Sequence, residues 1–152
     1  MEFNIVKSCR IVDNEVVYHV NDKAFDCSIP VNTDIYFTMA YLNLGVDSQD
    51  MLVKCFWGFS PLQSWIERKL KIPYAEEGSL RLLGEYEPGF TLRIDKDKKW
   101  EAYFDSQSGL YCIGKPSIEK DDNSVKILKN MVAVLSKDNH LKAIWVKPLF
   151  LE

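Results

Sequence analysis

The chain contains two histidines, the side chains best suited to proton transfer near neutral pH. His19 falls in an apolar, strand-like run and His140 in a turn. An imidazole can both donate and accept a proton, so two histidines and a lysine suffice for ribonuclease chemistry. No spacing in the sequence brings these two together, and we interpret them as a strand residue and a turn residue.

Serine offers two further candidate positions. A serine nucleophile usually stands on a sharp turn of the form G-x-S-x-G, which Gly58-Phe59-Ser60-Pro61 does not match, and we expect Ser60 to cap a helix. The turn from Ser106 to Gly109 could offer amides to an anion, but a hairpin explains it. The phosphate-binding, dinucleotide-binding and H-E-x-x-H motifs are absent from the sequence. We therefore expect a protein that is not an enzyme and needs no cofactor.

The possible metal ligands also lack the spacing of a metal site. Four cysteines are spread along the chain, without a C-x-x-C pair or a neighbouring histidine: Cys9, Cys27, Cys55 and Cys112. Each falls in an apolar strand pattern, which favours reduced core thiols over zinc ligands or disulfides. Asp95, Asp97 and Asp105 flank a turn, but the glycine and distal glutamate of a calcium loop are missing. No metal site is predicted.

Aromatic residues gather where a strand leads into a predicted helix, at Phe56, Trp57, Phe59 and Trp65. Such a cluster can line a pocket or anchor an interface. We assign Trp57 and Trp65 to the core, because each falls on the apolar side of its element. Phe59, between a glycine and the cap, has no such role and is a candidate contact residue.

Acidic residues gather in or beside predicted turns, and loops lie at the surface. We expect them to form exposed clusters that contact a basic partner: Asp47, Asp50, Glu76, Glu77, Glu85, Glu87, Glu119, Asp121 and Asp122. An electronegative surface of this kind speeds encounter with a basic protein and disfavours wrong partners.

Composition fits a single folded domain over residues 1–152. Hydrophobic residues make up 47% and charged residues 27% of the chain, as in ordinary globular domains. The net charge is -3 and the pI about 5.5, which argues against a nucleic-acid or anionic-membrane partner. The start of the chain does not resemble a secretion signal, and no apolar run is long enough to span a bilayer. We expect a cytoplasmic protein.

Most of the chain shows strand patterns, so the predicted class is α+β with predominantly antiparallel sheet. Asx-rich or glycine turns separate the runs 4–12, 15–20 and 24–29, and later 100–105, 110–113, 125–128, 131–135 and 141–146. The apolar run 35–44 suggests one central strand, followed by 51–57. Pro88-Gly89 predicts a hairpin between 79–86 and 90–95. These strands would form a bent sheet, a half-barrel or a sandwich.

One amphipathic helix is predicted from about Pro61 to Lys71. Proline suits its first position, and Leu62, Trp65, Ile66 and Leu70 recur with helical spacing. Pro73 would end it. The helix would pack on the sheet or close one end of it.

In size, acidity and lack of catalytic motifs, the whole chain resembles the bacterial immunity proteins that neutralise toxins, including those of contact-dependent growth inhibition. The resemblance implies an interaction protein that occludes the active site of a cognate, basic toxin domain. No motif carries site residues across.

Two alternatives remain open. A β-barrel-like domain could hold a small molecule or a substrate in an aromatic pocket lined by Trp57, Trp65, Trp100 and Trp145. The apolar segment Leu149-Phe150-Leu151 could instead dock across a homodimer, although we expect it to fold back onto its own core.

Overall fold

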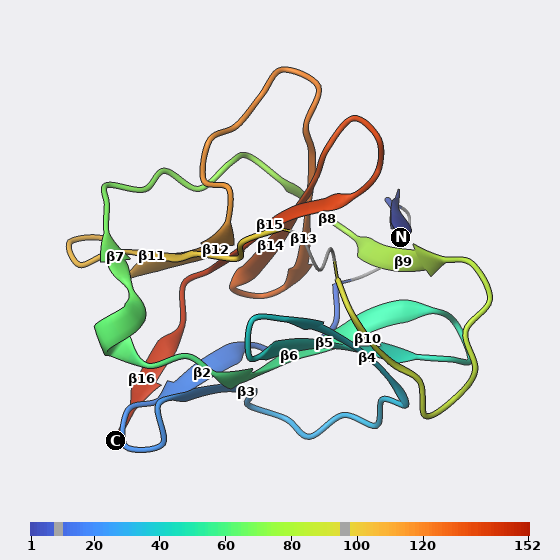
Figure 1. The fold of residues 1–152 in the computed structure, drawn as a ribbon, viewed down its shortest axis with the longest axis horizontal. Helices are drawn as coiled ribbons and strands as arrows, with labels where there is room; N and C mark the ends of the chain where they lie inside the picture. Colours follow the sequence, from blue (N-terminus) through green and yellow to red (C-terminus); the bar gives the residue numbers. More distant parts are fainter. Residues whose placement is uncertain (8–10, 95–97) are drawn as a thin grey trace.

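The computed structural model describes residues 1–7, 11–94 and 98–152, and the regular structure in these ranges is almost entirely β. Two twisted sheets lie face to face (Figure 1). The helical structure in the described ranges is one short 3-10 turn, Leu62–Ser64, and no helix there could cross a membrane. The prediction of an α+β fold is therefore wrong.

Sheet A is built around the N-terminal half of the chain. Its strands follow the order β10 (Thr91–Arg93), β4 (Ile35–Met39), β5 (Leu42–Asp47), β6 (Leu52–Phe59), β3 (Ala24–Cys27), β2 (Val16–His19) and β16 (Leu149–Leu151), and β9 (Ser79–Leu83) joins β6 to β1 (Glu2–Val6).

Sheet B contains most of the C-terminal half. Its order is β7 (Ile66–Glu67), β11 (Ala102–Asp105), β12 (Leu110–Gly114), β15 (Leu141–Val146), β14 (Met131–Leu135), β13 (Asn123–Leu128) and β8 (Glu76–Glu77).

Each sheet order ends in a short parallel strand on both sides. β10 pairs with β4 and β16 with β2 in sheet A, while β7 pairs with β11 and β8 with β13 in sheet B. Between these ends the pairings are antiparallel. Both sheets are thus mixed, and neither closes on itself.

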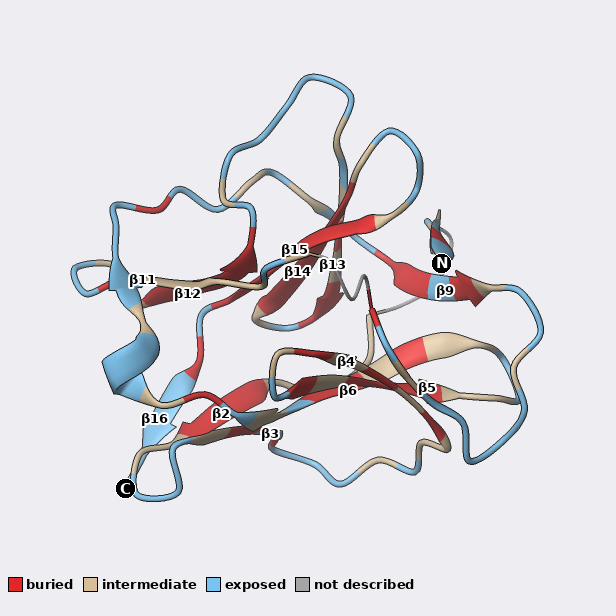
Figure 2. Cartoon of the chain, in the orientation of Figure 1, coloured by how far each residue is buried: buried red, intermediate tan, exposed pale blue. Residues whose placement is uncertain are grey.

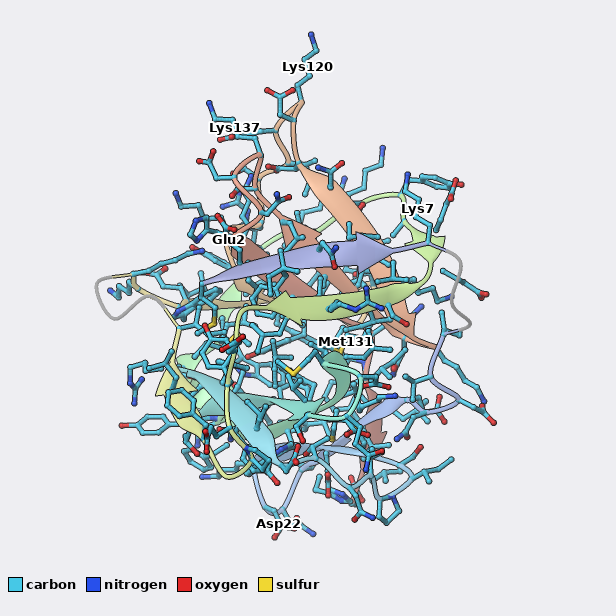
Figure 3. All side chains as sticks on the ribbon, turned by 90° about the vertical axis from the view of Figure 1, so that its right-hand side faces the viewer. Glu2, Lys7, Asp22, Lys120, Met131 and Lys137 are labelled. Carbon is cyan, nitrogen blue, oxygen red and sulfur yellow. The ribbon has the colours of Figure 1, made fainter. Side chains whose placement is uncertain are left out.

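The main core fills the space between the sheets. Buried segments occur in the strands of both layers (Figure 2). The core cluster contains residues from both sheets, among them Phe37 and Phe56 of sheet A and Tyr111 and Ile144 of sheet B. Met131 lies in the interior, whereas Lys120 and Lys137 project from loops (Figure 3). Each fully buried large side chain contributes about 1.5 to 3 kcal/mol through removal of apolar surface from water.

A second, smaller core covers the outer face of sheet B. Leu70, in the segment that follows β7, packs there with Cys112 and Trp145. The buried Asp105 carboxylate accepts the Leu70 amide hydrogen at 3.0 Å and also the amides of Gln107 and Ser108. One aspartate therefore orders both the covering segment and the β11–β12 turn.

The predicted helix from Pro61 to Lys71 is not formed, because its apolar residues are divided between different environments. Leu62 and Ile66 are more than 40% exposed, whereas Leu70 is buried on sheet B. After the 3-10 turn, Ile66 begins β7 beside β11. An isolated helix of this length is marginal in water, so tertiary contacts decide the conformation.

The predicted central strand over 35–44 is two strands. Ala40 adopts a positive φ of 54°, and the chain reverses there so that β4 and β5 form a hairpin. The β5–β6 pairing then brings Gly58 against the backbone of Tyr41 and Leu42, where a Cβ atom would collide. A glycine is required at this close approach.

Some of the other predicted hairpins are present in the structure and some are not. The hairpins β2–β3, β11–β12, β13–β14 and β14–β15 are confirmed. The hairpin across Pro88-Gly89 is wrong, because β9 pairs with β1 and β6 while β10 pairs with β4. The first strand likewise pairs with β9 rather than with its neighbour in sequence.

Candidate functional site

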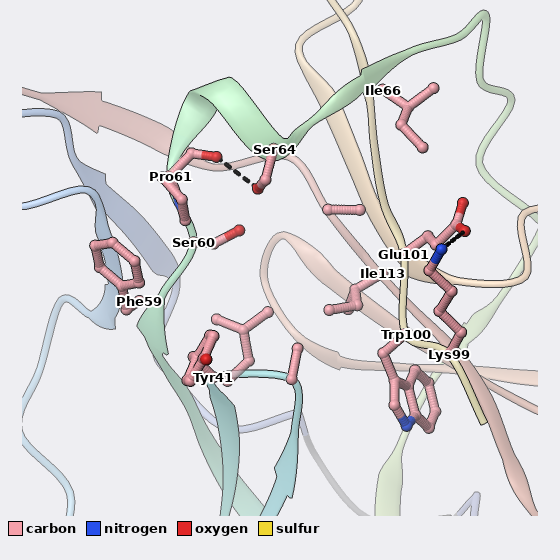
Figure 4. Close-up of a pocket in the computed structure, with 13 residues that line it drawn as sticks. Tyr41, Phe59, Ser60, Pro61, Ser64, Ile66, Lys99, Trp100, Glu101 and Ile113 are labelled. Carbon is pink, nitrogen blue, oxygen red and sulfur yellow. Dashed lines mark hydrogen bonds and ion pairs between the residues drawn. The ribbon is translucent and has the colours of Figure 1, made fainter. Parts of the chain in front are cut away.

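An apolar groove of about 390 Å³ opens between the two sheets, where the β4–β5 turn, the end of β6 and the start of β11 meet (Figure 4). It is lined by Ala40, Tyr41, Leu42, Phe59, Ser60, Pro61, Ser64, Ile66, Lys99, Trp100, Glu101, Ala102 and Ile113. Its volume falls in the range of small-molecule pockets, roughly 300 to 1,000 Å³.

Ser60 forms a fixed polar point in the wall of the groove. Its hydroxyl accepts the indole hydrogen of Trp65 at 2.8 Å and shares a hydrogen with the Tyr111 hydroxyl at 3.0 Å. The Ser60 carbonyl accepts the Tyr18 hydroxyl at 2.7 Å. Burial raises the pKa values of both tyrosines. Ser60 is therefore neither a helix cap nor a free nucleophile, but joins β2 and β12 to the segment after β6.

Aromatic rings pack next to this polar point and stiffen the wall. Trp65 lies 5.1 Å from Tyr18, 5.0 Å from Tyr111 and 5.0 Å from Phe104, measured between ring centroids. Phe25 also contacts Tyr111, with the two ring planes tilted and their centroids 4.7 Å apart. Ring pairs at these separations add roughly 0.5 to 1.5 kcal/mol each beyond burial. The groove thus has a preformed wall.

The mouth of the groove carries two exposed aromatic rings. Tyr41 is 73% exposed and Phe59 48% exposed, and their centroids are 6.4 Å apart in an edge-to-face arrangement. Ile66 adds an exposed aliphatic side chain from β7. These three residues, which we call the mouth residues, surround an apolar opening.

The charged residues that line the groove in the described part of the chain form an ion pair. Lys99 contacts Glu101 at 3.2 Å, and Glu101 also accepts the Tyr103 hydroxyl. The hydrogen bond from Lys99, and after it the one from Tyr103, lowers the pKa of Glu101 below its ordinary value. The carboxylate is thus ionised and paired. The Ser60 hydroxyl is likewise already hydrogen-bonded to Trp65 and Tyr111. The groove is therefore suited to holding an apolar group rather than to transferring a proton.

The predicted acidic contact residues fall into two groups, separate from the groove. One group surrounds the β5–β6 turn and the β9–β10 connection, which meet at the bond from the Leu82 amide to the Met51 carbonyl: Asp47, Asp50, Glu85 and Glu87. The other lies at the β8–β13 edge and the β12–β13 connection: Glu76, Glu77, Glu119, Asp121 and Asp122.

Several of these carboxylates stabilise the fold locally. The side chain of Asp122 is buried, forms an ion pair with Lys142 and accepts the Glu119 amide hydrogen. Asp50 pairs with Lys54 at 2.9 Å, and Asp47 accepts the Gln49 amide hydrogen. Glu85 and Glu87 are exposed beside one another. Asp122 is thus unavailable as a surface contact.

The candidate chemical residues are not assembled into one site. His19 ends β2 in sheet A, whereas His140 precedes β15 in sheet B. Ser106 to Gly109 closes the β11–β12 hairpin. Asp95 and Asp97 lie outside the described residues, and the described part of the chain holds no cluster of metal-ligating side chains.

The cysteine prediction is confirmed for the three thiols that the structure describes. Cys27, Cys55 and Cys112 are free and buried, while Cys9 lies outside the described residues. Cys27 and Cys55 lie together, which the sequence did not suggest.

The tryptophans do not line a common cavity as the pocket alternative required. Trp100 lines the groove, and Trp65 lies in the core cluster beside Ser60. Trp145 is buried on the outer face of sheet B. Trp57 is 38% exposed, so its assignment to the core is wrong.

The sequence identified one of the two aromatic mouth residues. Phe59 was singled out because it had no structural role, and it lies at the mouth. Tyr41 was missed because it fell within the apolar run read as one strand. The turn at Ala40 has no glycine, proline or asparagine to mark it.

Comparison with known proteins adds no relative. A scan against models of known protein families finds no match, and a search of curated proteins finds none either. The function must therefore be argued from the geometry.

Proposed function

We propose that this protein is a binding protein that holds a partner protein against the apolar groove, with Tyr41 and Phe59 as its main contacts. The observation that carries the proposal is the pair of exposed rings at the mouth of a preformed apolar opening. Binding energy at interfaces concentrates in a few aromatic residues that enter or border such pockets.

The rigidity of the wall supports this proposal. The hydrogen bonds of Ser60 and the rings around Trp65 fix the groove before any partner arrives. A preformed surface loses little conformational entropy on association. The partner we expect would insert an apolar or aromatic side chain between the mouth residues.

The finer form of the proposal is an immunity protein that blocks a cognate, basic toxin domain. Its support is the net charge of -3 and the exposed carboxylates Glu85 and Glu87. These carboxylates would increase the rate of encounter, whereas the groove would hold the complex. In this form the protein neutralises by occlusion and performs no reaction of its own.

The test is affinity capture from the source cells, followed by measurement of the affinity for the captured partner. The double variant Tyr41→Ala, Phe59→Ala should bind at least about 10 to 100 times more weakly, as expected for the loss of two anchor rings. Tyr74→Ala is the matched control, because Tyr74 is 85% exposed and lies at the β8–β13 edge. Equal affinities for all three proteins would refute the groove as the contact surface.

A charge-reversal variant tests the immunity form separately. Glu85→Lys with Glu87→Lys should slow association at low ionic strength and leave dissociation nearly unchanged. Glu119→Lys with Asp121→Lys probes the other acidic group and leaves the buried ion pair of Asp122 intact. Unchanged association rates for both variants would argue against a basic partner.

A small-molecule binder is the second candidate, favoured by the groove volume of about 390 Å³. Native mass spectrometry of the purified protein distinguishes the two. A retained apolar molecule that Tyr41→Ala and Phe59→Ala release, together with capture of no protein, would favour the small molecule.

A further inference from the structure

Cys27 and Cys55 bring their thiols together at the boundary between β3 and β6. The two Sγ atoms lie 2.8 Å apart, with the Cys55 thiol donating to Cys27. Disulfide bonds measure about 2.05 Å, so the sulfurs are within about 1 Å of bonding distance.

The local structure explains why these thiols meet. The β3–β6 ladder pairs Ala24 with Phe59 and Phe25 with Gly58. Beyond it, the Cys27 amide hydrogen goes to the Asp26 side chain, and the Cys27 sulfur accepts the Phe56 amide hydrogen at 3.4 Å. The thiol of Cys27 therefore occupies the space between the strands where main-chain pairing stops.

A bulge in β6 places Cys55 on the same side as Cys27. The pairing with β5 shifts between Gly45 and Val46, so that Val53 and Phe56 both face the core. The extra residue reverses the alternation, so that Cys55 and Trp57 line the same pocket, Cys55 as a buried residue and Trp57 as an exposed one. This shift is also the reason that Trp57 is exposed.

Both thiols can be reached from outside. They line a pocket of about 270 Å³ on the outer side of sheet A, together with Trp57, Tyr36 and the 29–33 segment. Each cysteine keeps 7% of its surface exposed. A molecule as small as hydrogen peroxide can enter a pocket of this size.

The two thiols differ in their ease of ionisation. The hydrogen bond from Cys55, and to a smaller extent the one from the Phe56 backbone, lowers the pKa of Cys27. The same contact with Cys27, with burial second, raises the pKa of Cys55. Cys27 is thus the better nucleophile of the pair, and Cys55 remains protonated beside it.

We propose that Cys27 and Cys55 form a reversible dithiol–disulfide site, with peroxide as oxidant and small cellular thiols as reductant. The Cys27 thiolate attacks one peroxide oxygen and the O–O bond breaks, giving a sulfenic acid and, after protonation, water. The Cys55 sulfur then attacks the Cys27 sulfur and breaks its S–O bond, and the leaving hydroxide takes up the Cys55 proton to give a second water. Two thiols and one hydrogen peroxide give one disulfide and two waters, and two small thiols reverse the oxidation of the protein.

Oxidation would join strands that lead directly to the groove. The cross-link would span residues 27 and 55 and enclose β4 and β5. It would hold together β3 and β6, whose far ends meet at Ala24 and Phe59. The dithiol site stands apart from the binding proposal, because its geometry and its test involve neither the mouth residues nor a partner.

The experiment oxidises the wild-type protein with one equivalent of hydrogen peroxide, blocks remaining thiols with an alkylating reagent and maps the peptides by mass spectrometry. The expected result is a Cys27–Cys55 linked peptide that has lost two hydrogens and is restored by dithiothreitol. The melting temperature should rise by roughly 7 to 14 °C on oxidation, from the entropy of closing this loop.

Cys112→Ala is the matched control, because Cys112 is buried in the separate outer core of sheet B. It should form the same link, whereas Cys27→Ala and Cys55→Ala should not. Wild-type protein in which both thiols are alkylated after peroxide treatment, or in which Cys27 is over-oxidised without a link, would overturn the proposal. Because that result is read on the wild-type chain, it does not depend on the folding of any variant.

Discussion

Replacing Ser60 by alanine should destabilise the protein much more than the loss of one surface hydroxyl would. The Ser60 hydroxyl is the hydrogen-bond partner of both Trp65 and Tyr111. Tyr111 is fully buried, whereas Trp65 is only partly buried. Removing the hydroxyl therefore leaves one phenol without a partner in the core, and water can reach only the indole.

The magnitude follows from these contacts. The lost bond to Trp65 accounts for about 1 kcal/mol, and the unpaired buried Tyr111 hydroxyl for about 1 to 3 kcal/mol. We expect the free energy of unfolding to fall by about 2 to 4 kcal/mol in Ser60→Ala. The melting temperature should fall by roughly 5 to 15 °C for a chain of this size.

A double-mutant cycle separates the unpaired hydroxyl from a general packing defect. Tyr111→Phe removes the phenol oxygen and should cost about 1 kcal/mol, and adding it to Ser60→Ala should restore part of the lost stability. Urea unfolding followed by circular dichroism measures all four proteins. Tyr103→Phe, at the partly exposed bond to Glu101, is the control and should change stability by no more than about 0.5 kcal/mol. Additive losses, within about 0.5 kcal/mol, would refute the proposed pairing.

Two further predictions concern carboxylates that the structure uses internally. Asp122→Ala should lower the free energy of unfolding, measured by urea unfolding, by about 3 to 5 kcal/mol, because Lys142 is left charged and buried. Adding Lys142→Met to the same chain should recover part of the lost stability. Wild-type stability of Asp122→Ala would contradict a structural ion pair. The hydrogen bond from the Leu70 amide lowers the pKa of Asp105 most, burial opposes this shift, and the bonds from Gln107 and Ser108 lower the pKa further. The stability that this group adds is therefore present above its unfolded pKa of about 3.9 and is lost as the pH falls through the lower folded pKa. Asp105→Asn should therefore weaken the dependence of the unfolding free energy on pH below about pH 4, where the unfolded carboxylate takes up a proton. Urea unfolding at a series of acidic pH values, followed by circular dichroism, measures this dependence, and an unchanged dependence would exclude this role.

Local sequence signals predicted the local part of the fold. The hairpins β2–β3, β11–β12 and β14–β15 have short polar or glycine-containing turns, and their strands pair with the next strand in sequence. Turn chemistry and alternation suffice for such pairs. The rest depends on partners that are distant in sequence, such as β1 with β9 and β16 with β2.

The failed helix shows how a tertiary contact can override a periodic pattern. Leu62, Ile66 and Leu70 have helical spacing, but sheet B offers a burial site only to Leu70. Trp65 is partly buried instead, through its bond to Ser60 and its ring contacts. Leu62, Trp65, Ile66 and Leu70 are thus compatible with a helix and with an extended segment. The position of sheet B decides which conformation forms.

The candidate site was predictable in part for a similar reason. Phe59 could be found because no local role accounted for it, whereas Tyr41 needs the unmarked turn at Ala40 to reach the mouth. The exposure of Trp57 follows from a one-residue bulge, which alternation in the sequence does not reveal.

The strand beside the groove limits how a partner can be recognised. β7 consists of two residues, Ile66 and Glu67, and one side of it already pairs with β11. A visiting chain that added itself as a new strand here would find too few backbone groups to register against. In the proposed complex, recognition at the groove would therefore depend on side chains, and partners would be distinguished by the shape of one inserted residue and not by an extended peptide backbone.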